Sequence, residues 1–139
     1  HVRSRRQRQM CIRDRYGLPY SEYFIWFDDR EYTLRLTARC PGVQVLDSVV
    51  VHDMGDNRGV NFAMVDRKSL WKFSYGVRNE ASWQLHHRGF LYFMEFGARL
   101  FVSLHRGRVP LDLRAKLLGK WVKGITFNPK IKYPEAEAA

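Results

Sequence analysis

Apolar residues recur at helical spacing through the second half of the chain. In three segments after residue 66 they lie three or four positions apart, which predicts three amphipathic helices. The faces expected to be buried are Leu70, Phe73, Val77 and Ala81; then Phe90, Phe93, Met94, Gly97, Phe101 and Leu104; then Leu111, Ala115, Leu118, Val122 and Ile125. Gly89 and Gly107 separate the segments. Residues 66–139 are therefore expected to form a helical C-terminal extension.

The first half of the chain has a different pattern. Residues 20–27 are aromatic and apolar without alternation, which suits a short buried strand or the approach to a helix. Asp28 and Glu31 fit a capping box, so a helix is expected to begin there. Residues 43–51 are rich in valine and predict a strand. This order of elements indicates half of an α/β domain over residues 16–65.

Composition places the chain among globular proteins. Hydrophobic residues make up 45% and charged residues 27%, which is too apolar for a disordered chain. The two cysteines, Cys11 and Cys40, give neither a disulfide framework nor a zinc site. No apolar run is long enough to span a bilayer, and no secretory signal follows the basic start. We therefore expect a cytoplasmic protein, with peripheral attachment to the inner face of the membrane kept open.

The net charge of +10 is concentrated at the N-terminus, because residues 1–15 contain six arginines and one aspartate. The string RQRQMCIRDR within them resembles translated sequencing-adapter sequence. We therefore expect residues 1–15 to be a non-native, disordered tail. The remaining chain is interpreted as the C-terminal part of a longer protein that enters the reading frame near Tyr16.

The densest acidic cluster comprises Asp28, Asp29 and Glu31, at the expected start of a helix. Carboxylates at a helix N-terminus are stabilised in their ionised form and can act as bases near neutral pH. The alternative is that Asp28 and Glu31 only cap the helix. His52 follows the predicted strand and could bind a divalent metal, although a lone histidine there is also consistent with a structural or surface role.

A third element is the segment from Ser74 to Asn79, SYGVRN. Arg78 can bind a phosphate or a carboxylate through two parallel hydrogen bonds, and Asn79 lies beside it. The alternative is an exposed helix face. The histidines at positions 86, 87 and 105 lie among arginines and are interpreted as solvated surface residues.

Taken in order, FIWFDDREYTLR, PGVQVLDSVVVH and FSYGVRN resemble the second half of family-2 inverting glycosyltransferases. The resemblance is greatest to the bacterial rhamnosyl- and galactofuranosyl-transferase branch and covers residues 17–124. It implies the C-terminal half of a GT-A domain, a Rossmann-like α/β fold that binds a nucleotide sugar. The nucleotide-binding half and its D-x-D motif are missing, so the fragment alone is expected to be inactive.

The resemblance also assigns roles. Asp29 matches the catalytic base, and Asp28 and Glu31 match its acidic neighbours. His52 matches the histidine that completes a divalent-metal site, for Mn²⁺ or Mg²⁺. Three further residues match substrate-binding or supporting positions, namely Arg35, Arg78 and Asn79.

Trp26 is also a predicted substrate-binding residue. Its position is often acidic in the rhamnosyl branch, which leaves the transferred sugar open. We expect Asp28, Asp29 and His52 to converge on one face, where the strands of the sheet end.

The predicted function is thus metal-dependent transfer of a sugar from a nucleotide-sugar donor to a glycan or lipid-linked acceptor. The expected partners are these substrates and an anionic membrane surface, with no nucleic acid. The basic composition leaves one alternative, a membrane-surface or nucleic-acid-binding module without catalysis.

Overall fold

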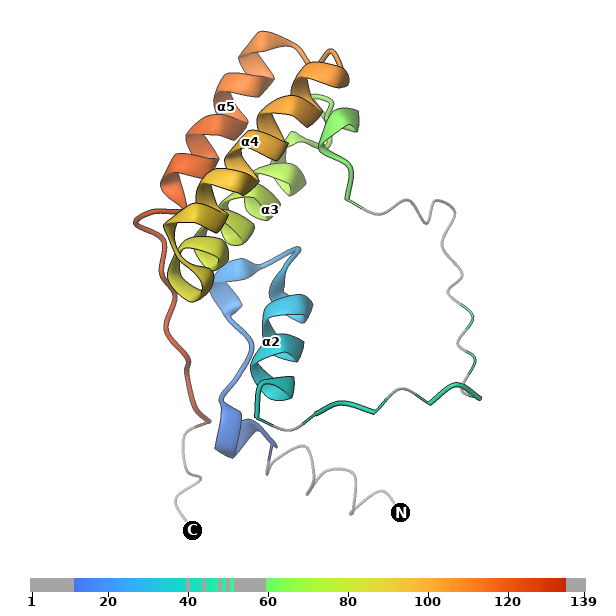
Figure 1. Ribbon diagram of the computed structural model, residues 1–139, viewed down its shortest axis with the longest axis vertical. Helices are drawn as coiled ribbons and strands as arrows, with labels where there is room; N and C mark the ends of the chain where they lie inside the picture. The colour runs from blue at the N-terminus through green and yellow to red at the C-terminus, as the bar shows by residue number, and fades with distance from the viewer. Residues whose placement is uncertain are drawn as a thin grey trace.

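The computed structural model describes residues 12–39, 41–43, 45–47, 49, 51 and 60–134, and its regular elements are all helical. Residues 12–16 form a helical turn. The other elements are η1 (Ser21–Tyr23), α2 (Asp28–Thr37), η2 (Phe62–Met64), α3 (Leu70–Trp83), the π-helix η3 (Gln84–Arg88), α4 (Phe90–Arg106) and α5 (Leu111–Lys123). Helices α3, α4 and α5 form a bundle, with α2 and the N-terminal segment beside one end of it (Figure 1).

The predicted α/β fold is wrong, because the described residues contain no strand and no sheet. A strand is stable only when it pairs with a neighbour and buries one face. In the segment predicted as a strand, Val43, Val49 and Val51 are each more than 80% exposed. Residues 20–27 form η1 and an irregular turn instead of a strand. The described part of residues 16–65 therefore does not form the predicted α/β half-domain.

The three helices predicted after residue 66 are confirmed, and they enclose the main core. Helix α3 contributes the predicted residues Phe73, Val77 and Ala81 to it. Helices α4 and α5 meet closely at Gly97, where an added Cβ would lie 2.6 Å from the Trp121 ring. Glycine at this position lets the Trp121 indole stack on Phe93, with the ring centroids 4.5 Å apart.

The buried faces of α4 and α5 differ in part from those predicted. In α4 the core takes Phe96 and Leu100, whereas Phe90, Met94 and Phe101 are exposed. In α5 the buried leucines are Leu113 and Leu117, not the predicted stripe that begins at Leu111. Both helices carry apolar residues on more than one side, so spacing alone does not fix which side faces the core. Among the described helices, none combines the length and the apolar character needed to cross a bilayer.

A second, smaller cluster joins the two ends of the described chain. Its buried members are Tyr20, Tyr23 and Phe27, and Trp83 and Phe127 pack against them. The Leu18 amide donates to the Lys132 carbonyl at 2.8 Å, so the segment after α5 runs back along the segment before α2 (Figure 1). Burial raises the pKa of the Tyr23 hydroxyl far above its usual range, which keeps this side chain neutral inside the cluster.

Three residues just before α2 have an unusual backbone. Phe24, Trp26 and Phe27 have φ of 59°, 62° and 73°, in the left-handed region that non-glycine residues seldom adopt. Each such residue costs roughly 1–3 kcal/mol, so the surrounding structure must hold it in place. Phe27 occupies the N-cap position of α2 and makes no side-chain cap hydrogen bond. The helix thus begins at Asp28 as predicted, but without the predicted capping box.

Two neighbouring residues of α3 hold this strained segment. The buried Asn79 amide donates to the backbone carbonyls of Tyr23 and Trp26, both at 2.9 Å, and to that of Ile25 at 3.3 Å. Arg78 donates to the Glu22 carbonyl at 2.7 Å and to the Asn79 side-chain oxygen at 2.9 Å. These bonds satisfy carbonyls that no helix or strand pairs, and so fix the chain leading into α2.

Replacing Asn79 tests this anchor. Asn79→Ala leaves the Tyr23 and Trp26 carbonyls without their donor, so the free energy of unfolding should fall by about 3 kcal/mol in urea denaturation. Asn79→Asp keeps the shape but removes the N–H groups and should lose at least as much. Asn128→Ala, an exposed control, should stay within about 0.5 kcal/mol of the wild type. An Asn79→Ala protein as stable as this control would contradict the anchoring role.

Candidate functional site

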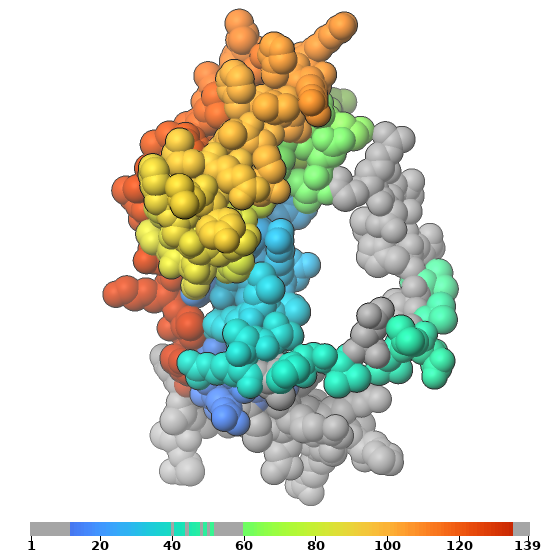
Figure 2. Space-filling model, viewed as in Figure 1, coloured from blue at the N-terminus to red at the C-terminus, as the bar shows by residue number. Residues whose placement is uncertain are grey.

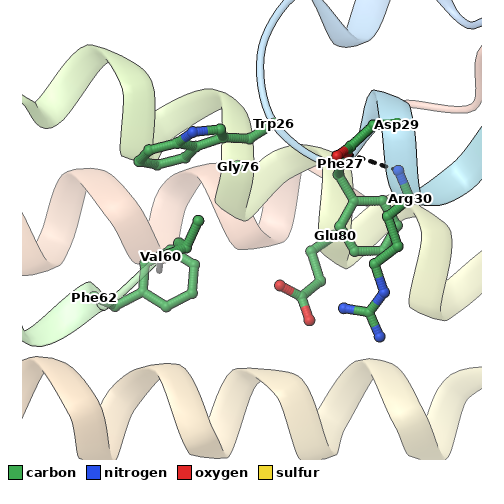
Figure 3. Close-up of a pocket in the computed structure, with 8 residues that line it drawn as sticks. All are labelled: Trp26, Phe27, Asp29, Arg30, Val60, Phe62, Gly76 and Glu80. Atoms are coloured by element: carbon green, nitrogen blue, oxygen red, sulfur yellow. Dashed lines mark hydrogen bonds between the residues drawn. The ribbon is translucent and has the colours of Figure 1, made fainter. Parts of the chain in front are cut away.

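A pocket of about 390 Å³ lies between the start of α2 and the middle of α3 (Figure 3). Its walls combine aromatic rings and carboxylates, from Trp26, Phe27, Asp29, Phe62, Gly76 and Glu80. Aromatic faces beside a few polar groups are typical of sites that bind small polar molecules with apolar faces. The strained backbone described above forms one side of this pocket.

The indole of Trp26 forms the wall against α3. An added Cβ at Gly76 would lie 2.7 Å from the Trp26 ring, so only glycine permits this close approach. The ring also packs edge-on against Phe73, with 4.9 Å between the centroids. A glycine in the middle of a helix weakens it, and contact with Trp26 is the physical reason for it here.

Asp29 is the exposed carboxylate of the pocket. It lies in the first turn of α2, and its Oδ1 accepts a hydrogen bond from the Arg30 backbone amide at 2.7 Å. The Arg30 guanidinium lies 5.1 Å from the centre of the Phe27 ring. Asp29 is thus held by the helix start and keeps its outer oxygen open to a ligand.

Glu80 is the second carboxylate, one helical turn after Gly76 on the same face of α3. Figure 3 shows its side chain extending in the same direction as that of Arg30. Burial raises the pKa of the Glu80 carboxyl above its usual value, while the positive charges of Arg30 and Arg99 act in the opposite direction. Glu80 can therefore hold a proton at a higher pH than a solvated glutamate.

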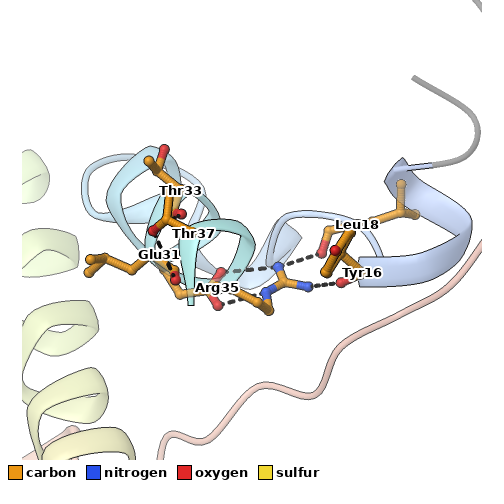
Figure 4. Close-up of polar contacts among 7 residues, drawn as sticks. Tyr16, Leu18, Glu31, Thr33, Arg35 and Thr37 are labelled. Atoms are coloured by element: carbon orange, nitrogen blue, oxygen red, sulfur yellow. Dashed lines mark hydrogen bonds and ion pairs between the residues drawn. The ribbon is translucent and has the colours of Figure 1, made fainter. Parts of the chain in front are cut away.

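Glu31 and Arg35 form a buried ion pair behind this site (Figure 4). Arg35 donates to the two Glu31 carboxylate oxygens at 2.9 and 3.1 Å. The same guanidinium donates to the carbonyl of Leu18 at 2.9 Å and to that of Tyr16. The pair therefore ties α2 to the N-terminal segment, and Glu31 is only 1% exposed. Both side chains face other protein groups and not the pocket.

Of the remaining predicted site residues, those that the structure describes do not line the pocket. Asp28 is half-buried at the start of α2 beside Asp29. Arg78 and Asn79 bind the backbone before α2, as described above. His52 lies outside the described residues, so its predicted convergence with Asp28 and Asp29 stays a prediction.

The predicted metal ion is not matched by the described side chains. Across residues 12–39 and 60–134, no three His, Cys, Asp or Glu side chains gather into a group that could hold a metal. Asp29 and Glu80 are the two carboxylates that line the pocket. The Mn²⁺ or Mg²⁺ site through His52 stays a prediction, and no chemical step is derived through it.

Sequence reasoning missed Glu80, Arg30 and Phe62 as pocket residues. A signal existed for Glu80, since it follows Asn79 directly and lies four residues after Gly76, on the same helical face. No signal existed for Phe62, which reaches the pocket from η2 only through the tertiary fold.

No protein-family model, curated protein or solved structure matches this chain. The transferase interpretation therefore depends on the motifs of the chain and on the chemistry of this pocket.

The raised pKa of Glu80 predicts a pH-dependent effect on stability. A carboxyl whose pKa is higher in the folded than in the unfolded state favours folding at low pH, and this contribution is lost as the pH rises through the folded-state pKa. Glu80→Gln should therefore raise the Tm relative to wild type at pH 7, and the difference should vanish near pH 4. The Tm measured from pH 4 to pH 8 tests this. Glu95→Gln, the same change at an exposed position of α4, is the control. A Glu80→Gln protein less stable than wild type at pH 7 would contradict the prediction.

Proposed function

We propose that this chain carries the acceptor-side part of an inverting glycosyltransferase, with Asp29 as the catalytic base. The observation that supports it is one pocket that combines the exposed Asp29 carboxylate with the Trp26 ring and the second carboxylate of Glu80. A sugar presents C–H groups on its faces and hydroxyls at its edges. Aromatic walls suit the faces, and carboxylates accept hydrogen bonds from the hydroxyls.

The reaction is a single displacement at the anomeric carbon of a nucleotide sugar. The acceptor hydroxyl oxygen forms a bond to this carbon and gives its proton to Asp29. The bond from the carbon to the diphosphate breaks, and its electron pair leaves with the nucleoside diphosphate. General-base assistance of this kind is worth on the order of 10²–10⁴ in rate. The donor and the metal expected from the family resemblance are assigned to no described residue.

In this proposal the other predicted residues support the base. Asn79 and Arg78 are positioning residues, because they hold the backbone that leads to Asp29. Glu31 and Arg35 fix α2 against the N-terminal segment. Glu80 accepts a hydrogen bond from a second hydroxyl of the acceptor when it is ionised.

We also propose that the protein works at the inner face of a membrane as a peripheral protein. The observation that favours this location is the composition of α4, α5 and their flanks. From Arg88 to Lys123 the chain has eight arginines and lysines but only two acidic residues, beside exposed apolar side chains. A basic surface with apolar residues favours anionic lipid.

Sugar binding to the protein tests the acceptor pocket. Methyl α-L-rhamnopyranoside and methyl β-D-galactofuranoside should each show saturation transfer from the protein in NMR at millimolar concentration. Trp26→Ala should weaken binding by about tenfold, which corresponds to about 1.4 kcal/mol of lost stacking. Asp29→Asn should weaken it less, because an amide still accepts a hydrogen bond.

The controls are Trp71→Ala, an exposed tryptophan outside this pocket, and Asp112→Asn, which also lies in the first turn of a helix. Both should bind the two glycosides as the wild type does. Equal binding by wild type and Trp26→Ala, or no saturation transfer from either glycoside, would overturn the proposed site.

A further inference from the structure

Helix α4 exposes a second apolar face, adjacent to the face that packs in the core. Its core face consists of Phe93, Phe96, Gly97, Leu100 and Leu104. The outward side carries large apolar residues, which are Phe90, Leu91, Met94, Phe101 and Val102, with exposed fractions from 44% to 82%. Figure 2 shows this helix, yellow to orange, across the front of the molecule. Burying one face of a helix is enough for a soluble fold, so the outward face is free for another role.

The outward apolar face has a basic border. Successive residues of an α-helix are rotated by about 100° about its axis. This rotation places Arg99 and Arg106 next to Leu91 and Val102, so the two arginines lie along one edge of the outward apolar face. Both arginines also flank a groove of about 530 Å³ whose floor includes Ala98 and Val102. The carboxylate nearest to them along the helix, Glu95, lies 3.6 Å from the Arg99 guanidinium. An occupant of this surface therefore meets apolar side chains beside positive charge.

Charge decides among the candidate occupants. A second copy of the chain would bring the same arginines face to face, and like charges repel. An anionic bilayer supplies both required features, negative headgroups for the arginines and acyl chains for the leucine and phenylalanine side chains. Arginine and lysine near an anionic surface each contribute about 1 kcal/mol.

We propose that the outward face of α4 is a docking surface for anionic phospholipid, with Leu91, Met94 and Phe101 entering the headgroup region. This inference deepens the peripheral location proposed above and is independent of the role of Asp29. The neighbouring helix α5 also exposes two apolar residues, Leu111 and Val122.

Vesicle flotation of the full chain tests the proposal. It should bind vesicles containing about a third phosphatidylglycerol at low salt, and bind pure phosphatidylcholine vesicles at least tenfold more weakly. The double variant Leu91→Ser/Phe101→Ser should bind the mixed vesicles at least tenfold more weakly than wild type. Arg99→Gln/Arg106→Gln should lose about tenfold at low salt and less at high salt.

Two matched controls separate this face from the rest of the chain. Val43→Ser/Val49→Ser changes exposed apolar residues outside the helices, and Arg39→Gln/Lys130→Gln removes two exposed charges elsewhere. Both should float with the vesicles as wild type does. If the α4 variants bind like wild type, the docking face is wrong although a peripheral location stands. If the wild type binds neither vesicle, both proposals fail.

Sedimentation equilibrium covers the competing occupant. A dimer that dissociates in Leu91→Ser/Phe101→Ser, without vesicle binding by wild type, would make this face a protein interface and overturn the lipid assignment. Binding of the methyl glycosides should be unchanged in the α4 variants, so the acceptor pocket is tested separately from the membrane surface.

Discussion

The side-chain amide of Asn79 connects the bundle to the candidate site. It donates to backbone carbonyls on both sides of a turn in which Phe24, Trp26 and Phe27 all have positive φ. Such a turn is unfavourable in isolation. It persists because its carbonyls accept hydrogen bonds from the buried Asn79 amide, which would otherwise lack acceptors. This turn also determines where α2 begins, and therefore where Asp29 lies. Two of the strained residues, Trp26 and Phe27, therefore also line the pocket.

Two contacts show how glycine sets the geometry of the molecule. Gly76 admits the Trp26 ring to the surface of α3, and Gly97 admits the Trp121 ring between α4 and α5. In both cases a small residue on a helix receives a large aromatic ring, and the backbone-to-ring distance is shorter than any side chain would permit. The first contact shapes the pocket, and the second sets the spacing of the bundle. Each glycine costs some helix stability, and the packing of a partly buried indole offsets that cost.

The sequence predicted the helices after residue 66 well and the first half poorly. Spacing of Phe73, Val77 and Ala81 identified the core face of α3, because that helix has one apolar side. In α4 it was right for Phe93, Gly97 and Leu104 but also placed the exposed Phe101 in the core, because the helix carries apolar residues on adjacent sides. The valines after residue 42 have the composition of a strand, but composition does not provide a pairing partner. In the site, Asp29 was visible as a carboxylate at a helix start, and the helical spacing of Glu80 from Gly76 was a signal that went unused. Phe62 joins the pocket only through the fold.

The small cluster that joins the chain ends has a consequence for the order of assembly during synthesis. Glu22 and Lys132 form an ion pair at 2.6 Å across a sequence separation of 110 residues, and Tyr23 lies beside Phe127. Helix α3 packs mainly against α5, which is not its neighbour in sequence, so the bundle closes only once α5 has been synthesised. Trp26 packs against α3, whereas Tyr23 gains its contact with Phe127 only after the residues that follow α5 have been made. During synthesis the small cluster would therefore be completed after the bundle, because it needs Phe127 and Lys132, which follow α5.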